Sequence, residues 1–263
     1  MQHARFSPSS PLSLPALDTR SALFLDFDGT LAELAPRPDA VRVPPELIDT
    51  LRALHQALQG AIAIVSGRPV AQLDALLAPL HLASAGVHGV ERRSADGYLQ
   101  RLPAPDGLIL VQQRADALAA ELPGLLVEHK PGALALHYRQ RPQARERCVE
   151  VMEAAVREAG GLTLLHGKMV LEAKPEMATK GHAIAAFLRE PPFLGRRPLF
   201  AGDDVTDEAG FAAVQAAGGD TLKIGEGETA AVHRLADPAA LRSWLARCAA
   251  QLAAQPTGSA DGG

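Results

Sequence analysis

The sequence predicts an α/β fold: a doubly wound, Rossmann-like parallel sheet into which a smaller α+β domain is inserted. Two observations carry this prediction. Short apolar runs alternate with segments of helical spacing near both ends of the chain, a pattern typical of parallel sheets with helices on both faces. Between residues 107 and 178 the alternation stops, and each helical segment is followed by two strand-like runs.

The two outer parts of the chain supply the predicted parallel sheet. The first helical segment, 45–58, carries leucines at a spacing of three and four residues, as a helix with one buried face does. In the N-terminal part we expect strands at 21–27, 61–65 and 82–85 and helices at 45–58 and 70–77. In the C-terminal part we expect helices at 180–188 and 207–215, strands at 198–201 and 222–224, and a last helix from near Thr229.

The middle of the chain repeats a helix–strand–strand unit twice. We expect helices at 108–122 and 142–159 and strands at 125–129, 133–138, 162–165 and 169–173. Such a unit without parallel crossovers predicts a separate α+β cap, with hinges at 106–107 and 174–179. The predicted division is a flexible N-terminal arm at 1–19, a core at 20–106 and 179–250, a cap at 107–178, and a disordered tail at 251–263.

The composition narrows the class of partner. The chain has 263 residues, of which 47% are hydrophobic and 21% are charged, and its formal net charge is −4. No overall basic field favours nucleic acid or a membrane surface, so an anionic substrate needs local cations or a metal. The two cysteines cannot form a disulfide framework, and no apolar run approaches the about 18 residues of a membrane span. We expect a cytoplasmic monomer acting on a small molecule.

Acidic residues follow the first predicted strand, in the segment Asp26-Phe27-Asp28-Gly29-Thr30. In a parallel sheet, ligands bind beside the carboxyl ends of the strands. Phosphoryl transfer needs a nucleophile, a proton donor and cations that absorb charge; Asp26 can attack, and Asp28 can donate and later accept a proton. The alternative for this segment by itself is an ordinary turn after a strand.

A second acidic cluster, Gly202–Glu208, follows the predicted strand at 198–201. Carboxylates gathered in one pocket repel each other unless a cation joins them, and Mg²⁺ prefers such hard oxygen ligands. Ser66 follows another strand and could donate a hydrogen bond to a phosphoryl oxygen. Lys180 opens a helix, where a cation is mildly unfavourable, so a role facing a phosphate is favoured.

Together, Asp26-x-Asp28-Gly29-Thr30, Ser66, Lys180 and Gly202-Asp203-x-x-x-Asp207 resemble, in this order, the four motifs of the haloacid dehalogenase (HAD) superfamily of phosphotransferases. The resemblance implies a HAD core in which Asp26 forms an aspartyl-phosphate and Asp28 is the general acid and base. It implies that Ser66 and Lys180 hold the phosphoryl group. Asp207 would not bind the metal directly, but would orient the surrounding groups from its outer shell. Mg²⁺ would be held by Asp26, the Asp28 carbonyl and Asp203.

Finer details resemble the trehalose-6-phosphate phosphatase family. The matching segments are Val65–Arg68, Gly86–Glu91, Glu128–Lys130, His137–Arg139, Glu172 with Pro175, Lys180-Gly181 and Gly202–Glu208. The resemblance implies Mg²⁺-dependent hydrolysis of trehalose 6-phosphate to trehalose and phosphate, with Arg68, His88, Glu128, Lys130 and Glu172 binding substrate. Lys174 departs from the family, which more often has arginine there.

Several alternatives remain at this stage. Glu128 and Lys130 point to the same face of a strand, where a weak surface ion pair is the simpler interpretation. His88 can be a core histidine, a hydroxyl-binding group or a loop residue. At the level of function, the alternatives are a phosphatase for another sugar phosphate such as sucrose phosphate, a phosphomutase, and an inactive regulatory subunit that binds a sugar phosphate.

Overall fold

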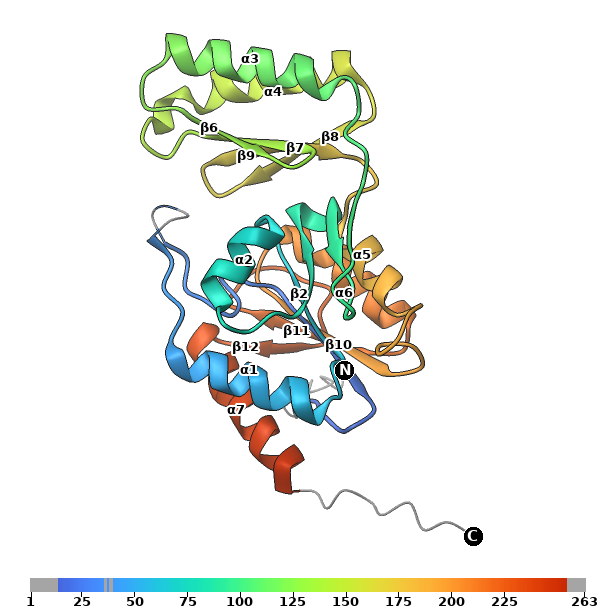
Figure 1. The fold of residues 1–263 in the computed structure, drawn as a ribbon. Helices are drawn as coiled ribbons and strands as arrows, with labels where there is room; N and C mark the ends of the chain where they lie inside the picture. Colours follow the sequence, from blue (N-terminus) through green and yellow to red (C-terminus); the bar gives the residue numbers. More distant parts are fainter. Residues whose placement is uncertain (1–13, 36, 38–39, 255–263) are drawn as a thin grey trace, which may run out of the picture.

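A computed structural model describes residues 14–35, 37 and 40–254. In this part of the chain, eight strands form one sheet in the order β12-β11-β10-β1-β2-β3-β4-β5 (Figure 1). Neighbours from β12 to β3 are parallel, and β4 and β5 add an antiparallel edge. The strands are β1 (Ser21–Leu25), β2 (Ile62–Val65), β3 (Ala83–Gly86), β4 (Glu91–Arg93), β5 (Leu99–Arg101), β10 (Arg197–Gly202), β11 (Asp220–Ile224) and β12 (His233–Leu235).

Helices cover both faces of this sheet, which is why every residue of β1 and β2 is buried and both strands are continuous apolar runs. The strands β2 and β3 follow β1 on one side of the sheet, whereas β10, β11 and β12 follow one another on its other side. Right-handed crossovers therefore place α1, between β1 and β2, and α6, between β10 and β11, on opposite faces. α1 packs against α7, and α5 packs against α6. The helices are α1 (Pro45–Ala57), α2 (Val70–Leu77), α5 (Lys180–Phe187), α6 (Glu208–Ala216) and α7 (Pro238–Ala254).

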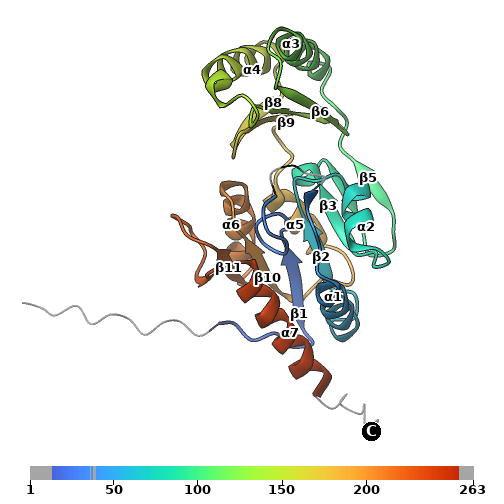
Figure 2. The same ribbon diagram turned by 90° about the vertical axis from the view of Figure 1, so that its left-hand side faces the viewer.

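Residues between β5 and α5 form a second layered unit, with a four-stranded antiparallel sheet in the order β6-β7-β9-β8. Helices α3 and α4 cover one face of this sheet, and its other face is turned toward the large sheet (Figure 2). Its apolar cluster is separate from that of the large sheet. The elements are α3 (Leu108–Glu121), β6 (Leu126–Lys130), β7 (Ala133–His137), α4 (Arg145–Ala159), β8 (Leu162–Gly167) and β9 (Val170–Pro175).

Three features differ from the sequence-based expectations. The hairpin of β4 and β5 was not predicted, because its strands are only three residues long each. The last helix begins at Pro238 rather than near Thr229, because β12 intervenes and Asp237 accepts a hydrogen bond from the Ala240 N–H at 2.8 Å. This helix continues to Ala254 and buries Leu252, so the predicted tail at 251–263 begins too early.

The predicted N-terminal arm at 1–19 lies partly outside the described residues. Of its described part, Leu17 is buried in the main core, so that segment is packed. The other predicted strands and helices are present with small shifts of their ends. Among the helices of the described residues, none has the length and apolar character needed to cross a membrane.

Candidate active site

A cavity of about 240 Å³ is lined by residues near the carboxyl ends of the strands of the large sheet and by residues of the four-stranded sheet. Among the sequence-predicted site residues, only Asp207 does not line it. From the large-sheet side the predicted residues that line it are Asp26, Asp28, Ser66, Arg68, His88, Lys180 and Asp203. From the four-stranded sheet the predicted residues that line it are Glu128, Lys130 and Glu172, and His137 lines it beside them. The fold therefore brings together residues that are up to 177 positions apart in sequence.

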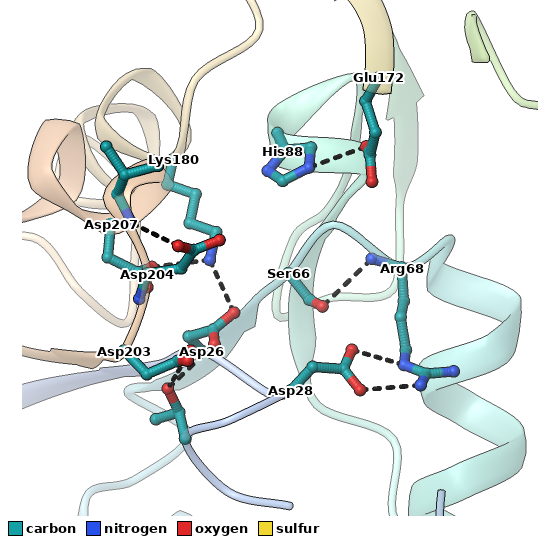
Figure 3. A network of polar contacts seen from close by, with 12 residues as sticks. Asp26, Asp28, Ser66, Arg68, His88, Glu172, Lys180, Asp203, Asp204 and Asp207 are labelled. Carbon is teal, nitrogen blue, oxygen red and sulfur yellow. Dashed lines mark hydrogen bonds and ion pairs between the residues drawn. The ribbon is translucent and has the colours of Figure 1, made fainter. Parts of the chain in front are cut away.

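Asp26 directly follows β1 and occupies the centre of the site (Figure 3). Its Oδ1 accepts a hydrogen bond from Lys180 Nζ at 2.7 Å, and its Oδ2 accepts one from Thr30 Oγ1 at 2.9 Å. The side chain is almost fully buried, yet it lines the cavity. Asp26 is thus held in a defined orientation while its carboxylate remains open to a ligand in the cavity.

Lys180 joins Asp26 to a second carboxylate. Its Nζ also donates to Asp207 Oδ1 at 2.6 Å, and Asp207 Oδ2 accepts the Asp204 N–H at 2.9 Å. Lys180 is the first residue of α5, whose N-terminus is capped by the Thr179 side chain. Burial disfavours the ammonium, but the charges of Asp207 and Asp26 outweigh this effect and raise the pKa of Lys180. Lys180 is therefore a permanent cation at the base of the site.

Asp26, Asp203 and Asp207 bring carboxylate oxygens within 4.8 Å of one another. Burial, opposed by Lys180 but reinforced by Asp207 and Asp28, raises the pKa of Asp26 to about 7. Burial, reinforced by Asp26, raises the pKa of Asp203 to about 7. One lysine does not compensate three carboxylates, so the donor set fits a hard divalent cation.

The two carboxylates best placed for that cation are Asp26 and Asp203, because both line the cavity. Asp207 is fully buried, and both of its oxygens already accept hydrogen bonds. The Asp28 side chain is not a member of this cluster. Its predicted metal contact is through the backbone carbonyl, which stays a prediction.

Asp28 and Arg68 form a bidentate pair: Arg68 Nε donates to Oδ2 at 2.6 Å and Nη2 donates to Oδ1 at 2.7 Å. The Ser66 Oγ accepts the Arg68 backbone N–H at 3.1 Å (Figure 3). Ser66 therefore occupies a tight turn immediately after β2, with its hydroxyl beside the cavity. Arg68, predicted to bind substrate, lines the cavity and also contacts the predicted acid and base.

Glu172 links the two layered units. Its Oε2 lies 3.1 Å from His88 Nε2, and its Oε1 accepts a hydrogen bond from Lys130 Nζ at 3.1 Å. Lys130 Nζ also donates to the Gly67 carbonyl at 3.1 Å. Burial opposes ionisation, but the charge of Lys130 and the hydrogen bonds with His88 and Lys130 overcome it and lower the pKa of Glu172. Lys130 is therefore paired with Glu172 in a partly buried contact, and not with Glu128 in the weak surface ion pair considered above.

His88 reaches Glu172 from a backbone turn of unusual conformation. Val87 and His88 have φ angles of 49° and 55°, and a β-branched residue rarely adopts this left-handed region. A Cβ on Gly67 would lie 2.7 Å from His88 Nε2, so Gly67 provides the space for the imidazole. The Nδ1 of His88 is buried without a hydrogen-bond partner. Such strain at a site is typical of functional constraint.

Glu128 accepts its hydrogen bond within the four-stranded sheet. His137 Nε2 lies 3.0 Å from Glu128 Oε2, because the two residues are on the neighbouring antiparallel strands β6 and β7. This contact lowers the pKa of Glu128. Glu128 and His137 therefore line the cavity as a pair.

Three residues that contribute to the site were not predicted from the sequence. Thr30 donates toward both Asp26 and Asp203, at 2.9 and 3.3 Å. Buried Lys223 donates to the Asp203 carbonyl. Asp204 caps the turn that carries Asp207. Thr30 could have been found from its place in the Asp26–Thr30 motif, whereas nothing in the surroundings of Lys223 in sequence indicates its role.

Known protein families show which family this chain belongs to. Residues 24–234 match the sequence model of a family described as trehalose-phosphatase. The chain belongs to the trehalose-phosphatase family. A relative from Escherichia coli K12, named trehalose-6-phosphate phosphatase, is 44% identical over 232 residues, covering 88% of this chain and 87% of the relative.

Solved structures support the family's fold. The C-terminal domain of the C. albicans trehalose-6-phosphate phosphatase superposes with a TM-score of 0.80 at 22% identity, covering 89% of this chain and 93% of that domain. A HAD-superfamily phosphatase from Bacteroides thetaiotaomicron superposes with a TM-score of 0.56 at 16% identity, covering 92% and 99% of the two chains. The predicted HAD-like α/β core is therefore confirmed, and this trehalose-phosphatase family member belongs among phosphoric monoester hydrolases.

Proposed function

We propose that this chain is a Mg²⁺-dependent phosphatase that hydrolyses trehalose 6-phosphate to trehalose and orthophosphate, as a step of trehalose biosynthesis. The observation that carries the proposal is the position of Asp26, which is held by Lys180 and Thr30 and lines the cavity. Membership of the trehalose-phosphatase family supplies the substrate class.

The proposed reaction has two in-line steps. An Asp26 oxygen attacks phosphorus and the bond from phosphorus to the sugar oxygen breaks, while protonated Asp28 gives its proton to the departing sugar oxygen. Water then attacks the aspartyl-phosphate, Asp28 takes a proton from this water, and orthophosphate leaves with Asp26 restored. In this proposal Ser66 and Lys180 bind the phosphoryl oxygens, and Asp207 positions Lys180.

Mg²⁺ is the proposed cofactor, held by Asp26, the Asp28 carbonyl and Asp203. When bound, it would neutralise charge on the phosphoryl oxygens. The fit rests on the surplus of carboxylates over cations at the base of the cavity. Lys223, which donates to the Asp203 carbonyl, would support that residue from behind.

Residues 107–178 are proposed to act as a cap that binds the sugar. Glu128, Lys130 and Glu172 project from their sheet into the cavity and carry both hydrogen-bond donors and acceptors for hydroxyl groups. Their hydrogen bonds to His137, to Gly67 and to His88 would be exchanged in part for hydroxyls when a sugar enters. Arg68 and His88 are proposed to contribute mainly by orienting Asp28 and Glu172.

The deciding experiment is a phosphate-release screen over about twenty sugar phosphates, with Mg²⁺ and with excess EDTA. The proposal expects trehalose 6-phosphate to give the highest kcat/KM and EDTA to abolish turnover. A phosphatase for sucrose phosphate would prefer another substrate, and a phosphomutase would release little phosphate and need a bisphosphate activator. An inactive regulatory subunit would release none. Localisation in the cytoplasm and a monomeric state remain predictions.

A further inference from the structure

Glu91 is a buried carboxylate that lies outside the cavity, on β4. Only 2% of its surface is exposed. Its Oε2 accepts the Val70 backbone N–H at 2.8 Å, and its Oε1 accepts a hydrogen bond from Arg101 Nε at 2.9 Å. A buried carboxylate is costly unless its oxygens are hydrogen-bonded or paired, so these two contacts account for its presence.

The contact with Val70 places Glu91 at the N-terminus of α2. This helix begins at Val70 after Pro69, and no side chain from its own N-cap position accepts a hydrogen bond. The first N–H groups of a helix have no partner within the helix. A carboxylate near them is stabilised by the partial positive charge of the helix N-terminus. Glu91 therefore caps α2 from a different strand.

The turn that carries Ser66 lies immediately before this helix start and is held against the segment that precedes Glu91. Ser66 N donates to the Ala85 carbonyl at 2.8 Å, Val87 N donates to the Arg68 carbonyl at 3.0 Å, and His88 N donates to the Ser66 carbonyl at 2.9 Å. All three are backbone contacts. The Glu91–Val70 bond extends the same series and is made by a side chain.

The two segments approach so closely that a side chain between them is excluded. A Cβ on Gly86 would lie 2.8 Å from both the Arg68 carbonyl oxygen and the Val70 nitrogen. The position of Val70 thus sets the position of Arg68, whose backbone N–H orients the Ser66 hydroxyl and whose guanidinium holds Asp28. A shift at the start of α2 reaches both the phosphoryl-binding serine and the acid and base.

We propose that Glu91 is a positioning residue for catalysis, holding the start of α2 so that Ser66 and Arg68 face the reacting phosphate. This inference rests on the proposed function, because it assumes that Ser66 binds phosphate. Displacements of about 1 Å in such groups can lower rates by about a hundredfold, so the hydrogen bond to Val70 matters beyond its contribution to stability.

The test compares Glu91→Ala with Glu91→Gln, using p-nitrophenyl phosphate as substrate and orthophosphate as competitive inhibitor. Glutamine keeps a carbonyl acceptor for the Val70 N–H, whereas alanine removes it. We expect Glu91→Ala to lower kcat by about ten- to a hundredfold and to raise the inhibition constant of orthophosphate, and Glu91→Gln to restore both to within about threefold of wild type.

Two further variants separate positioning from stability. Val70→Pro removes the donor instead of the acceptor; proline is compatible with the first position of a helix, and the extended Pro69, with ψ of 146°, tolerates a following proline. Val70→Pro should lower kcat and weaken phosphate binding as Glu91→Ala does. It provides the same test if Glu91→Ala does not fold. Leu252→Ala, in α7, should lower Tm while leaving both kinetic readouts unchanged.

The outcomes are distinct. If Glu91→Ala and Val70→Pro lower Tm but keep wild-type kcat and phosphate inhibition, Glu91 is only structural and the inference is wrong. It is also wrong if Glu91→Gln is as impaired as Glu91→Ala, because the hydrogen bond to Val70 would then not be the cause. If the wild-type chain releases no phosphate, the proposed function fails first.

Discussion

Arg68 donates hydrogen bonds to both carboxylate oxygens of Asp28, although the two residues are 40 positions apart in sequence. Its guanidinium also lies 5.7 Å from the centre of the Phe27 ring. The segment that presents Ser66 to the cavity therefore also orients the carboxylate proposed to act as acid and base. Ser66, which is proposed to bind the phosphoryl group, and Asp28 are structurally linked through this one arginine.

Replacing Arg68 by lysine should separate charge from geometry. Lysine keeps the positive charge but cannot donate in the planar fork that matches a carboxylate. Losing one charge-assisted hydrogen bond, about 1.5 kcal/mol or more, should lower kcat by roughly tenfold for both trehalose 6-phosphate and p-nitrophenyl phosphate. Steady-state kinetics on the two substrates provide the measurement, and an unchanged kcat for both would show that Asp28 needs no such orientation.

Asp26→Asn should abolish turnover without unfolding the protein. The amide is nearly isosteric but is a poor nucleophile, and Lys180 retains Asp207 as its ionic partner. We expect kcat to fall more than about a thousandfold, equivalent to roughly 4 kcal/mol of barrier, with a circular dichroism spectrum like that of wild type. Asp28→Asn should also be severe, since the departing oxygen loses its proton donor. Substantial residual turnover by Asp26→Asn would rule out covalent catalysis through this residue.

Magnesium should bind and stabilise the free protein. The surplus of buried carboxylates is relieved by a cation, and a ligand at about 100 times its Kd stabilises a fold by about 2.7 kcal/mol. Tm should therefore rise with added Mg²⁺ and fall back with EDTA, together with activity. Ca²⁺ should bind but inhibit, because its more variable coordination misplaces Asp26. Asp203→Asn should lose the Tm response; if it keeps that response in full, the cation is held elsewhere.

Glu128→Gln should separate sugar binding from phosphate chemistry. Glu128 contacts His137 within the four-stranded sheet, whereas Lys130 also contacts the Gly67 carbonyl beside Ser66. A substitution of Glu128 is therefore less prone than one of Lys130 to disturb the phosphate-binding side of the cavity. Losing a charged hydrogen bond of about 1.5–3 kcal/mol should lower kcat/KM for trehalose 6-phosphate by roughly ten- to a hundredfold. Hydrolysis of p-nitrophenyl phosphate, which has no sugar hydroxyl for Glu128 to bind, should barely change.

His129→Ala is the matched control for that experiment. His129 is the next residue on β6, it is exposed, and it lies 3.3 Å from Asp116 on the helical side. Its removal should leave the kinetics on both substrates unaltered. Equal losses on the two substrates with Glu128→Gln would assign Glu128 a structural role, and no loss on either would remove the support for sugar binding by this strand.

His88 should make the folded state sensitive to mild acid. Burial lowers its pKa, Glu172 opposes this, and the charges of Lys180 and Lys130 add to the lowering. The unfolded chain therefore takes up this proton first, so the contribution of neutral His88 is complete above about pH 6.5 and is lost as pH falls toward the lower folded pKa. Between about pH 8 and about pH 5, Tm of wild type should fall more than Tm of His88→Gln.

That comparison isolates His88 because other groups titrate in both proteins. The raised pKa values of Asp26 and Asp203 act in the opposite direction, favouring the folded state as pH falls, but they are shared by wild type and variant. Parallel Tm curves for the two proteins would mean that His88 is protonated equally in the folded and unfolded states.

Much of the fold was predictable because its signals are local. The runs that became β1 and β2 are apolar throughout, since both faces of those strands are covered. The repeated helix–strand–strand pattern predicted the two helices and four strands of the middle segment in their order along the chain. The hairpin of β4 and β5 and the short β12 escaped prediction, because three residues carry too little pattern.

The sequence by itself determined which groups are candidates for the chemistry: Asp26, Asp28, Ser66, Lys180 and Asp203 stand out because each lies shortly after a strand or begins a helix. Only the tertiary structure decided which groups are paired. Glu172 meets His88 across 84 positions, and Lys180 meets Asp26 across 154. A side-chain hydrogen bond depends on the distance between two atoms in space, and no local pattern in the chain encodes that distance.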